Sequence, residues 1–159
     1  NMVRMGTLPM GVYPSKVCRR ISKDDGQLKP VMSVKTRISF IKILNPGDTT
    51  GYGMHFTAES ETRVAVLPMG YGDGYPRLRN SGHVLIGGQV ANIIGGNGMD
   101  ATMVDITHIS DAEVGDEVVL LGSQQENEIT AMMLAGWAKT VTYDILSRWT
   151  GRMDRVVES

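Results

Sequence analysis

The sequence predicts a mainly β fold: an antiparallel β-barrel, Greek-key-like in arrangement, with short helices near its C-terminal end. Between about Val31 and Leu121, hydrophobic and polar residues alternate with period two in several stretches, as in strands with one buried face. Turn residues separate these stretches at short, even intervals, which is typical of barrels and sandwiches. After Ser123 the hydrophobic residues recur at helical spacing instead.

We expect strands in four regions of the chain. The first region, 31–44, ends at the turn sequence Asn-Pro-Gly-Asp, and the second, 62–69, ends at a glycine cluster. The third region, 83–95, contains a Gly-Gly pair, and residues 113–122 form a turn followed by a further strand. Glycine and proline at these bends supply the backbone angles that tight turns need.

Residues 126–149 are expected to form a helical cap on the barrel. Gly136 and the β-branched run Thr-Val-Thr at 140–142 favour two short helices over one long helix. The hydrophobic residues at helical spacing are Ile129, Met132, Met133, Trp137, Val141, Ile145 and Leu146.

The beginning of the chain is expected to differ from the barrel. Residues 2–7, Met-Val-Arg-Met-Gly-Thr, read as an apolar strand interrupted by Arg4, and the polar stretch 18–30 reads as a loop that links it to the barrel. Because the chain begins with Asn1, as if within a strand, we expect a fragment of a longer protein.

Composition narrows the possible classes of function. A chain of 159 residues with 42% hydrophobic residues can bury the core of one compact domain. Its formal net charge of −1 gives no basic surface for nucleic acid. Cys18 has no cysteine partner and is expected to be buried and unreactive, and no His or Cys residues stand at metal-ligand spacing. No apolar run reaches the length of a membrane helix and no signal peptide is recognisable, so we expect a cytoplasmic protein without metal.

The stretch Pro68–Arg77, PMGYGDGYPR, is the strongest candidate for chemistry because it places phenols inside a glycine-rich turn after a strand. Glycine lets a ligand or another backbone come close. A tyrosine works as an acid or base near neutral pH only if its pKa falls by about three units, which requires roughly 4 kcal/mol of preference for the phenolate. A purely structural alternative is that Tyr71 and Tyr75 pack over the barrel mouth. The second glycine corner, GGNGMD at 95–100, could hold a carboxylate or phosphate with its backbone N–H groups, or simply turn the chain.

Taken in order, these and other motifs resemble alanine racemase over nearly the whole chain. The motifs are VRMG…YP, LKPVMSVKTRI, PGDTTGYG, RVAVLPMGYGDGYPR, VLIGG, GMDATMVDIT, GDEVVLLG and TYDILSR. The resemblance assigns residues 21–159 to the C-terminal β-barrel domain of that enzyme and residues 1–20 to the last strand and loop of its N-terminal (β/α)8 barrel. The motif of the catalytic lysine and most of that barrel are absent.

The resemblance implies a dimeric enzyme, an isomerase, that uses pyridoxal 5′-phosphate to interconvert L- and D-alanine for peptidoglycan synthesis. The cofactor withdraws electrons from the substrate, so that a proton can leave one face and return on the other. In the family the cofactor lysine serves one face, and the tyrosine that matches Tyr71 serves the other, reaching in from the second subunit. Gly72 stands where the family usually has alanine.

Further residues match positions with roles in the family. Arg4 matches the arginine that bonds the pyridine nitrogen, and Gly6 and Thr7 match the pair whose backbone N–H groups bind the phosphate, although isoleucine is common at the second place. Tyr143 matches the tyrosine whose hydroxyl bonds the phosphate and lines the inner entrance, and its presence favours alanine over serine as substrate.

The second glycine corner and the chain end also have counterparts. Met99 matches the residue whose backbone N–H binds the substrate carboxylate across the dimer, and Asp100 an acid that shapes the entrance, in GMD where CMD is commoner. Tyr52, in GYG, matches a motif tyrosine expected to be structural. The run RMDR at 152–155 replaces Arg-x-Pro-Arg, which affects the expected conformation of the tail alone.

Two alternatives stay open at this point. The chain could be a non-catalytic β-barrel module that binds a partner through its tyrosine rim, or part of a racemase for another amino acid such as serine. Under the main hypothesis the isolated chain is inactive, its partners are the second subunit and a small amino acid, and it contacts neither nucleic acid nor membrane.

Overall fold

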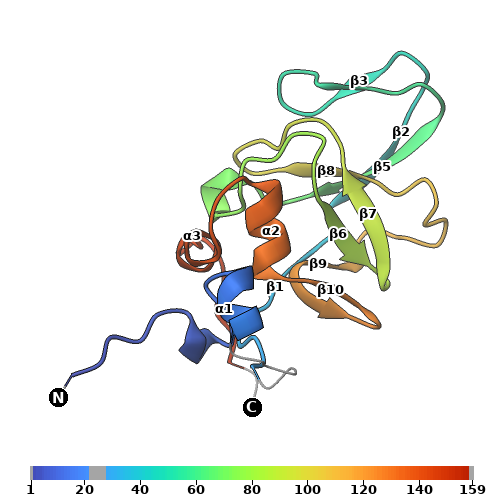
Figure 1. The fold of residues 1–159 in the computed structure, drawn as a ribbon. Helices are drawn as coiled ribbons and strands as arrows, with labels where there is room; N and C mark the ends of the chain where they lie inside the picture. Colours follow the sequence, from blue (N-terminus) through green and yellow to red (C-terminus); the bar gives the residue numbers. More distant parts are fainter. Residues whose placement is uncertain (1, 22–27, 158–159) are drawn as a thin grey trace.

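The computed structural model describes residues 2–21 and 28–157, and antiparallel strands dominate them. Eight strands form one strongly curled sheet, and a two-stranded arm, β3 with β4, projects from one end of it (Figure 1). The fold class predicted from the sequence is confirmed. The strands are β1 (Val34–Arg37), β2 (Phe40–Leu44), β3 (Thr49–Thr50), β4 (Phe56–Thr57), β5 (Thr62–Leu67), β6 (His83–Ile86), β7 (Gln89–Ile93), β8 (Thr102–Asp105), β9 (Glu117–Gln124) and β10 (Asn127–Ile129).

The order of strands explains why the sheet curls. They lie in the order β1-β9-β6-β7-β8-β5-β2, with β10 paired to β9, and every pair is antiparallel. The sub-order β9-β6-β7-β8 is a Greek key, in which a fourth strand returns beside the first of three consecutive ones. Strands β1 and β2 lie at the two ends of this order, although only Ile38 and Ser39 separate them in the sequence. One bent segment therefore pairs with β9 through its first half and with β5 through its second half, and so brings the two ends of the sheet together.

The hydrophobic core lies inside this curl, where β7 and β8 bury alternate residues and β5 and β9 bury neighbouring ones as well. In β5 the side chains of Val64, Ala65 and Leu67 are buried, and in β9 a run of four residues from Val118 to Leu121 is buried. Burial of each large aliphatic side chain contributes about 1.5–3 kcal/mol to folding. The main hydrophobic cluster runs from these strands into the helices at the C-terminal end.

Two short helices cap the barrel, as predicted. Helix α2 (Ala131–Trp137) begins at Thr130, whose hydroxyl oxygen accepts a hydrogen bond of 3.1 Å from the Met133 amide. Helix α3 (Thr142–Ser147) follows after a short connection, and Leu134 of α2 and Ile145 of α3 are both fully buried. Two of the residues chosen for helical spacing lie outside the helices, because Ile129 ends β10 and Val141 precedes α3.

The N-terminal segment differs from the prediction in three ways. Residues 2–6 form no strand, because no described strand lies beside them to exchange backbone hydrogen bonds. A 3-10 helix, η1 (Leu8–Met10), follows, and the stretch expected to be a polar loop from residue 18 onward begins as helix α1 (Lys16–Ile21). Cys18 is exposed on α1 rather than buried, since this short helix lies on the surface. The rest of the expected loop, residues 22–27, lies outside the described residues.

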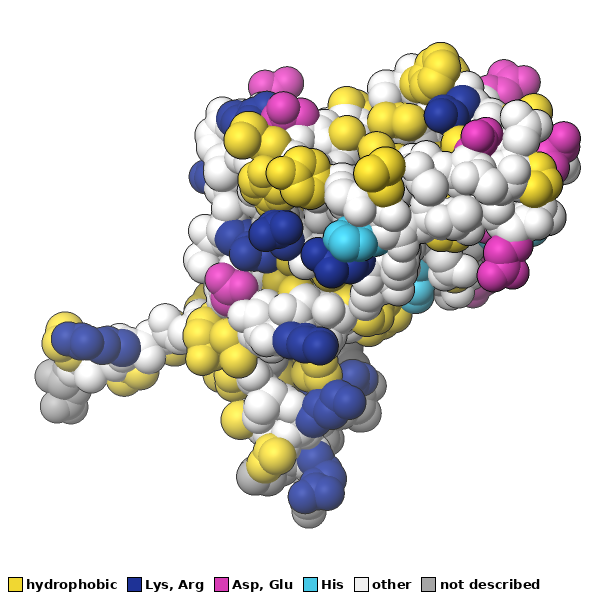
Figure 2. All heavy atoms as spheres, turned by 90° about the horizontal axis from the view of Figure 1, so that it is seen from above, with side chains coloured by type: hydrophobic (Ala, Val, Ile, Leu, Met, Phe, Trp, Pro, Cys, Tyr) yellow, Lys and Arg dark blue, Asp and Glu magenta, His cyan; other side chains and the backbone are white. Residues whose placement is uncertain are grey.

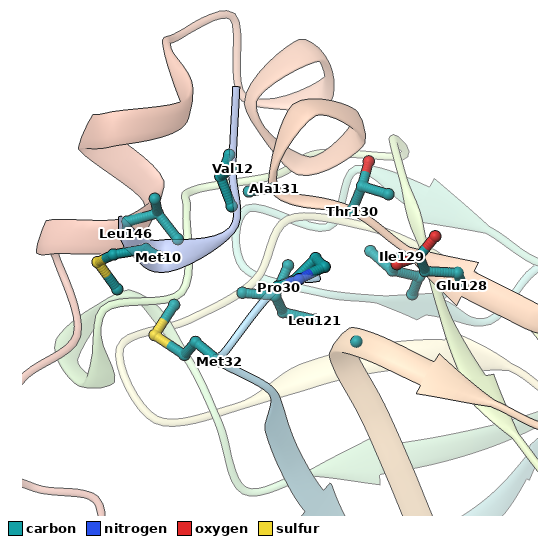
Figure 3. A pocket seen from close by; sticks show the side chains of 11 residues that line it. Met10, Val12, Pro30, Met32, Leu121, Glu128, Ile129, Thr130, Ala131 and Leu146 are labelled. Atoms are coloured by element: carbon teal, nitrogen blue, oxygen red, sulfur yellow. The ribbon is translucent and has the colours of Figure 1, made fainter. Parts of the chain in front are cut away.

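The end of η1 and the residues after it nevertheless pack against the β domain. Figure 3 shows Met10 and Val12 lining a small cavity together with Leu146, Pro30 and Leu121. Its volume of about 20 Å³ suffices for little more than one water molecule, so this cavity is no site for an amino acid or a cofactor. Within the described ranges 2–21 and 28–157, no helix has the length and apolar character needed to cross a membrane.

Candidate functional site

The glycine-rich stretch after β5 forms a tight turn that carries Tyr71 outward. Residues Tyr71–Asp73 form the 3-10 helix η2. The carboxylate of Asp73 accepts a hydrogen bond of 2.8 Å from the Gly70 amide, and the Tyr75 amide donates to the Gly70 carbonyl at 3.2 Å. Both bonds are internal to the turn, so the local sequence sets the backbone conformation that carries Tyr71.

The two tyrosines of this turn have opposite environments. The side chain of Tyr71 remains 39% exposed, whereas Tyr75 is 1% exposed and lies beside Trp149, with ring centroids 6.4 Å apart. Burial raises the pKa of Tyr75, so its hydroxyl stays protonated. The structural alternative, in which both rings pack over the barrel mouth, therefore holds for Tyr75 alone, and Tyr71 is the phenol that a partner or ligand can reach.

The fold brings the second glycine corner directly against this turn. The Tyr71 amide donates to the Gly98 carbonyl at 3.1 Å, and the Gly72 amide donates to the Met99 carbonyl at 2.9 Å. A side chain at Gly70 has no room, because its Cβ would lie 2.3 Å from the carbonyl oxygens of both Gly98 and Met99. The two motifs that the sequence left separate thus form one rigid surface.

At this surface Met99 and Asp100 are open to solvent. Met99 is 53% exposed and the Asp100 side chain 62% exposed. Within the part of the chain that the structure describes, the Met99 amide has no hydrogen-bond acceptor. That amide is therefore available to an acceptor such as a carboxylate.

Sequence reasoning missed one residue of this surface. Arg152, in the C-terminal segment, bonds Asp100 at 2.6 Å and Asp73 at 3.2 Å. The hydrogen bond with Asp100 and the charge of Asp73 raise the pKa of the Arg152 guanidinium, which stays charged throughout the physiological range. Its position in RMDR, far from both acids in the sequence, offered no signal of this contact.

Tyr52 lies on the same end of the molecule. From the sequence, this tyrosine was expected to have a structural role. It belongs to the loop between β3 and β4, its side chain is 68% exposed, and its amide donates to the Gly96 carbonyl at 2.7 Å. It lines a hollow of about 330 Å³ together with Arg77, Leu78, Arg79, Gly96 and Asn97.

The neighbourhood of this hollow is both apolar and basic. The guanidinium of Arg77 lies over the ring of Tyr71, 5.9 Å from its centroid, and Arg77 also lines the hollow with Tyr52. Figure 2 shows hydrophobic and basic side chains next to each other on the face of the molecule seen from above. Such a mixture suits a small anionic ligand held against apolar surface.

The residues matched to cofactor positions lie elsewhere, on the N-terminal segment and α3. Arg4 and Gly6 are exposed, Tyr143 is 58% exposed, and the two elements touch where the Thr142 hydroxyl donates to the Pro14 carbonyl at 3.5 Å. The donor set fits a phosphate: among the described residues, the Gly6 and Thr7 amides have no acceptor, and the buried Thr7 hydroxyl has no partner.

The chain belongs to the alanine racemase C-terminal domain family, which it matches over residues 31–157. An alanine racemase of Clostridium perfringens is 39% identical over 155 residues, which are 97% of this chain and 39% of that protein. An alanine racemase of Halothermothrix orenii is 42% identical over 156 residues, 98% of this chain and 40% of that protein. The chain thus spans about 40% of the length of the curated relatives it matches.

Solved structures of alanine racemases have the same fold over most of this chain. The enzyme from E. faecalis superposes with a TM-score of 0.83 at 29% identity, covering 96% of this chain and 40% of that one. A structure from Clostridium difficile 630 in complex with cycloserine gives 0.81 at 36% identity, covering 92% of this chain and 37% of that one. The architecture described above is therefore that of an alanine racemase C-terminal domain.

Proposed function

We propose that this chain is the C-terminal domain of a cytoplasmic, pyridoxal-phosphate-dependent alanine racemase that interconverts L- and D-alanine for peptidoglycan synthesis. In this proposal residues 1–20 belong to the preceding barrel domain and residues 21–159 to the β domain. Membership of the family supports the class of reaction. The observation that carries the site is an exposed phenol, Tyr71, on a rigid turn hydrogen-bonded to the Met99 corner.

Racemisation needs a proton acceptor on one face of the substrate's α-carbon and a donor on the other. Bound pyridoxal phosphate would withdraw electrons from that carbon and so make its proton acidic. In the proposal Tyr71 exchanges the proton on one face, in the active site of the second subunit of a homodimer. The lysine for the other face comes from sequence that this chain lacks, so the isolated chain is inactive.

The remaining residues bind rather than react. The free amides of Gly6 and Thr7 and the hydroxyl of Tyr143 would hold the phosphate. Arg4 would donate to the pyridine nitrogen, and because a guanidinium cannot accept a proton, that nitrogen stays unprotonated. The free Met99 amide would hold the substrate carboxylate, and Asp100 would line the approach to it.

Tyr52 is a second candidate for the phenol that exchanges the proton. It is more exposed than Tyr71, at 68% against 39%, and it lines the hollow that contains Arg77 and Arg79.

The experiment measures α-hydrogen exchange in D2O, catalysed by the full-length enzyme and its Tyr71→Phe and Tyr52→Phe variants, for each enantiomer of alanine separately. Two bases on opposite faces each remove the proton of one enantiomer. Loss of the tyrosine base therefore slows exchange by about 10²–10⁴-fold for one enantiomer and leaves the other enantiomer's exchange in place. The cofactor absorption spectrum controls for binding.

The outcomes separate the candidates. One-sided loss in Tyr71→Phe assigns the base to Tyr71, and the same loss in Tyr52→Phe alone assigns it to Tyr52 and leaves Tyr71 a wall of the site. Full exchange of both enantiomers in both variants refutes a tyrosine base. Racemisation rates measured with serine and with alanine show which amino acid the enzyme prefers as substrate. The non-catalytic alternative is not favoured, since the relatives matched over nearly the whole chain are alanine racemases.

A further inference from the structure

The C-terminal segment 150–152 lies across the Tyr71 turn and bonds it at several points. The Thr150 amide donates to the Asp73 carbonyl at 3.0 Å, and the Thr150 hydroxyl donates to the Gly72 carbonyl at 3.3 Å. The Arg152 guanidinium then reaches Asp73 at 3.2 Å and Asp100 at 2.6 Å. One cation thus joins an acid of the turn to an acid of the Met99–Asp100 corner.

The acid on the turn side is itself part of the turn. The Asp73 side chain is only 10% exposed, and one of its carboxylate oxygens accepts from the Gly70 amide while the other faces Arg152. A change in the position of Arg152 is therefore transmitted to Gly70 and to the turn that carries Tyr71. On the corner side, Asp100 follows Met99 directly.

Gly72 provides the space in which this guanidinium lies. A Cβ at position 72 would come within 2.8 Å of Nη1 of Arg152 and 2.9 Å of Cγ of Met99. These two atoms belong to side chains that can move, whereas the carbonyl oxygen of Met99, 3.1 Å from the same Cβ, belongs to the backbone of the corner. The small residue at position 72 therefore leaves room for both the guanidinium and the Met99 corner.

We propose that Arg152 is a positioning residue that locks the Tyr71 turn to the Met99–Asp100 corner, and that Gly72 is the residue that makes room for it. The structural part of this statement follows from the contacts above, whereas its effect on catalysis rests on the proposed function. Arg152 acts through Asp73 and Asp100 and need not touch the substrate.

The test measures amide hydrogen exchange in the full-length enzyme, because the Tyr71 and Gly72 amides form the two backbone bonds between turn and corner. In Arg152→Gln these amides are expected to exchange about tenfold faster, while amides of the core strand β5 are unchanged. Arg155→Gln is the matched control, since it removes the same charge three residues further on and leaves exchange at the turn unaltered.

A double-mutant cycle tests the pairing with Gly72. Gly72→Ala is expected to speed exchange at Tyr71 severalfold in the wild-type background and by a smaller factor in Arg152→Gln, because the contact with Nη1 is then gone while those with Met99 remain. Arg152→Lys keeps the charge but cannot span both acids, so its exchange rate lies between those of wild type and Arg152→Gln. If Arg152→Gln also loosened the β5 amides, exchange at the Tyr71 amide in Arg152→Lys and Gly72→Ala would still show whether Arg152 holds the turn to the corner.

Unchanged exchange at Tyr71 and Gly72 in Arg152→Gln, or fully independent effects of the two substitutions, would overturn the proposal. The effect on catalysis is measured separately. Arg152→Gln should lower kcat about tenfold with the cofactor spectrum unchanged, and Arg152→Lys should restore part of the lost kcat. Altered exchange with unaltered kcat keeps the lock but refutes its catalytic role. Altered exchange in a protein that shows no racemisation at all refutes the proposed function alone.

Discussion

Gly70→Ala probes the contact between the two glycine corners most directly. The new Cβ would lie 2.3 Å from the carbonyl oxygens of Gly98 and Met99, whereas ordinary van der Waals contacts begin at 3.4 Å. Backbone atoms cannot rotate away as side-chain ends do, so the corner must move outward by about 1 Å. The bonds from the Tyr71 and Gly72 amides, now 3.1 and 2.9 Å long, would then exceed hydrogen-bond length.

The expected loss of stability follows from these contacts. Overpacking costs roughly 1–3 kcal/mol and two weakened hydrogen bonds about 0.5–1.5 kcal/mol each, so the free energy of unfolding should fall by about 3 kcal/mol. Urea unfolding measures this as a midpoint lowered by about 1.5 M at unchanged slope. Gly136→Ala, at an exposed helix position with nothing near its Cβ, is the control. A shift below about 0.3 M for Gly70→Ala would show that the corner accommodates a methyl group and that the inferred rigidity is wrong.

Three further changes have expected outcomes that the same urea titrations measure. Thr130→Ala removes the cap of α2 and should cost about 1 kcal/mol, and an unchanged midpoint would mean that the bond from the Met133 amide contributes nothing. Gly136→Ala should stabilise the protein by up to about 1 kcal/mol, because alanine restricts the unfolded chain and favours the helix; a lowered midpoint would contradict this. The third change concerns His83, whose ring lies 4.5 Å from that of Trp137 and whose pKa is lowered by burial. As pH falls, the unfolded chain therefore binds a proton on His83 near pH 6.5, whereas the folded chain binds it only at lower pH. The stability linked to His83 is fully present above about pH 6.5 and falls as pH falls below it. His83→Gln should flatten this dependence between about pH 7.5 and pH 5.5, and an equally steep fall in the variant would assign it to other groups.

The β core could be predicted because it depends on local alternation. In β7 and β8 the buried positions follow period two, as with Ala91 and Ile93 or Thr102 and Val104, and the turn residues between strands mark where each strand ends. The N-terminal segment could not be predicted in this way. An apolar run near Arg4 satisfies the composition of a strand, but a strand also needs a neighbour to pair with, and composition does not say whether one lies beside it.

For the candidate site, the sequence identified the pieces but not their arrangement. The turn of Tyr71 and the corner of Met99 were both recognised from their glycines, whereas the backbone bonds that join them depend on how β5 and β8 pair. Arg152 was missed because its two acids are 79 and 52 positions away in the sequence, although they lie beside it in space. The exposure of Tyr52 likewise depends on the arm formed by β3 and β4, and a three-residue motif carries no signal of it.

The bent segment shared by β1 and β2 has a consequence for how the chain folds. Its first half must find β9 and its second half β5, and the chain between them is long, so much conformational entropy is lost before those contacts compensate it. Topologies of this kind fold in milliseconds to seconds rather than microseconds. Until residues near 120 have left the ribosome, residues 34–37 lack their partner strand and can pair with other chains. Aggregation during synthesis should therefore respond to substitutions in this short stretch more than to those in the helical cap.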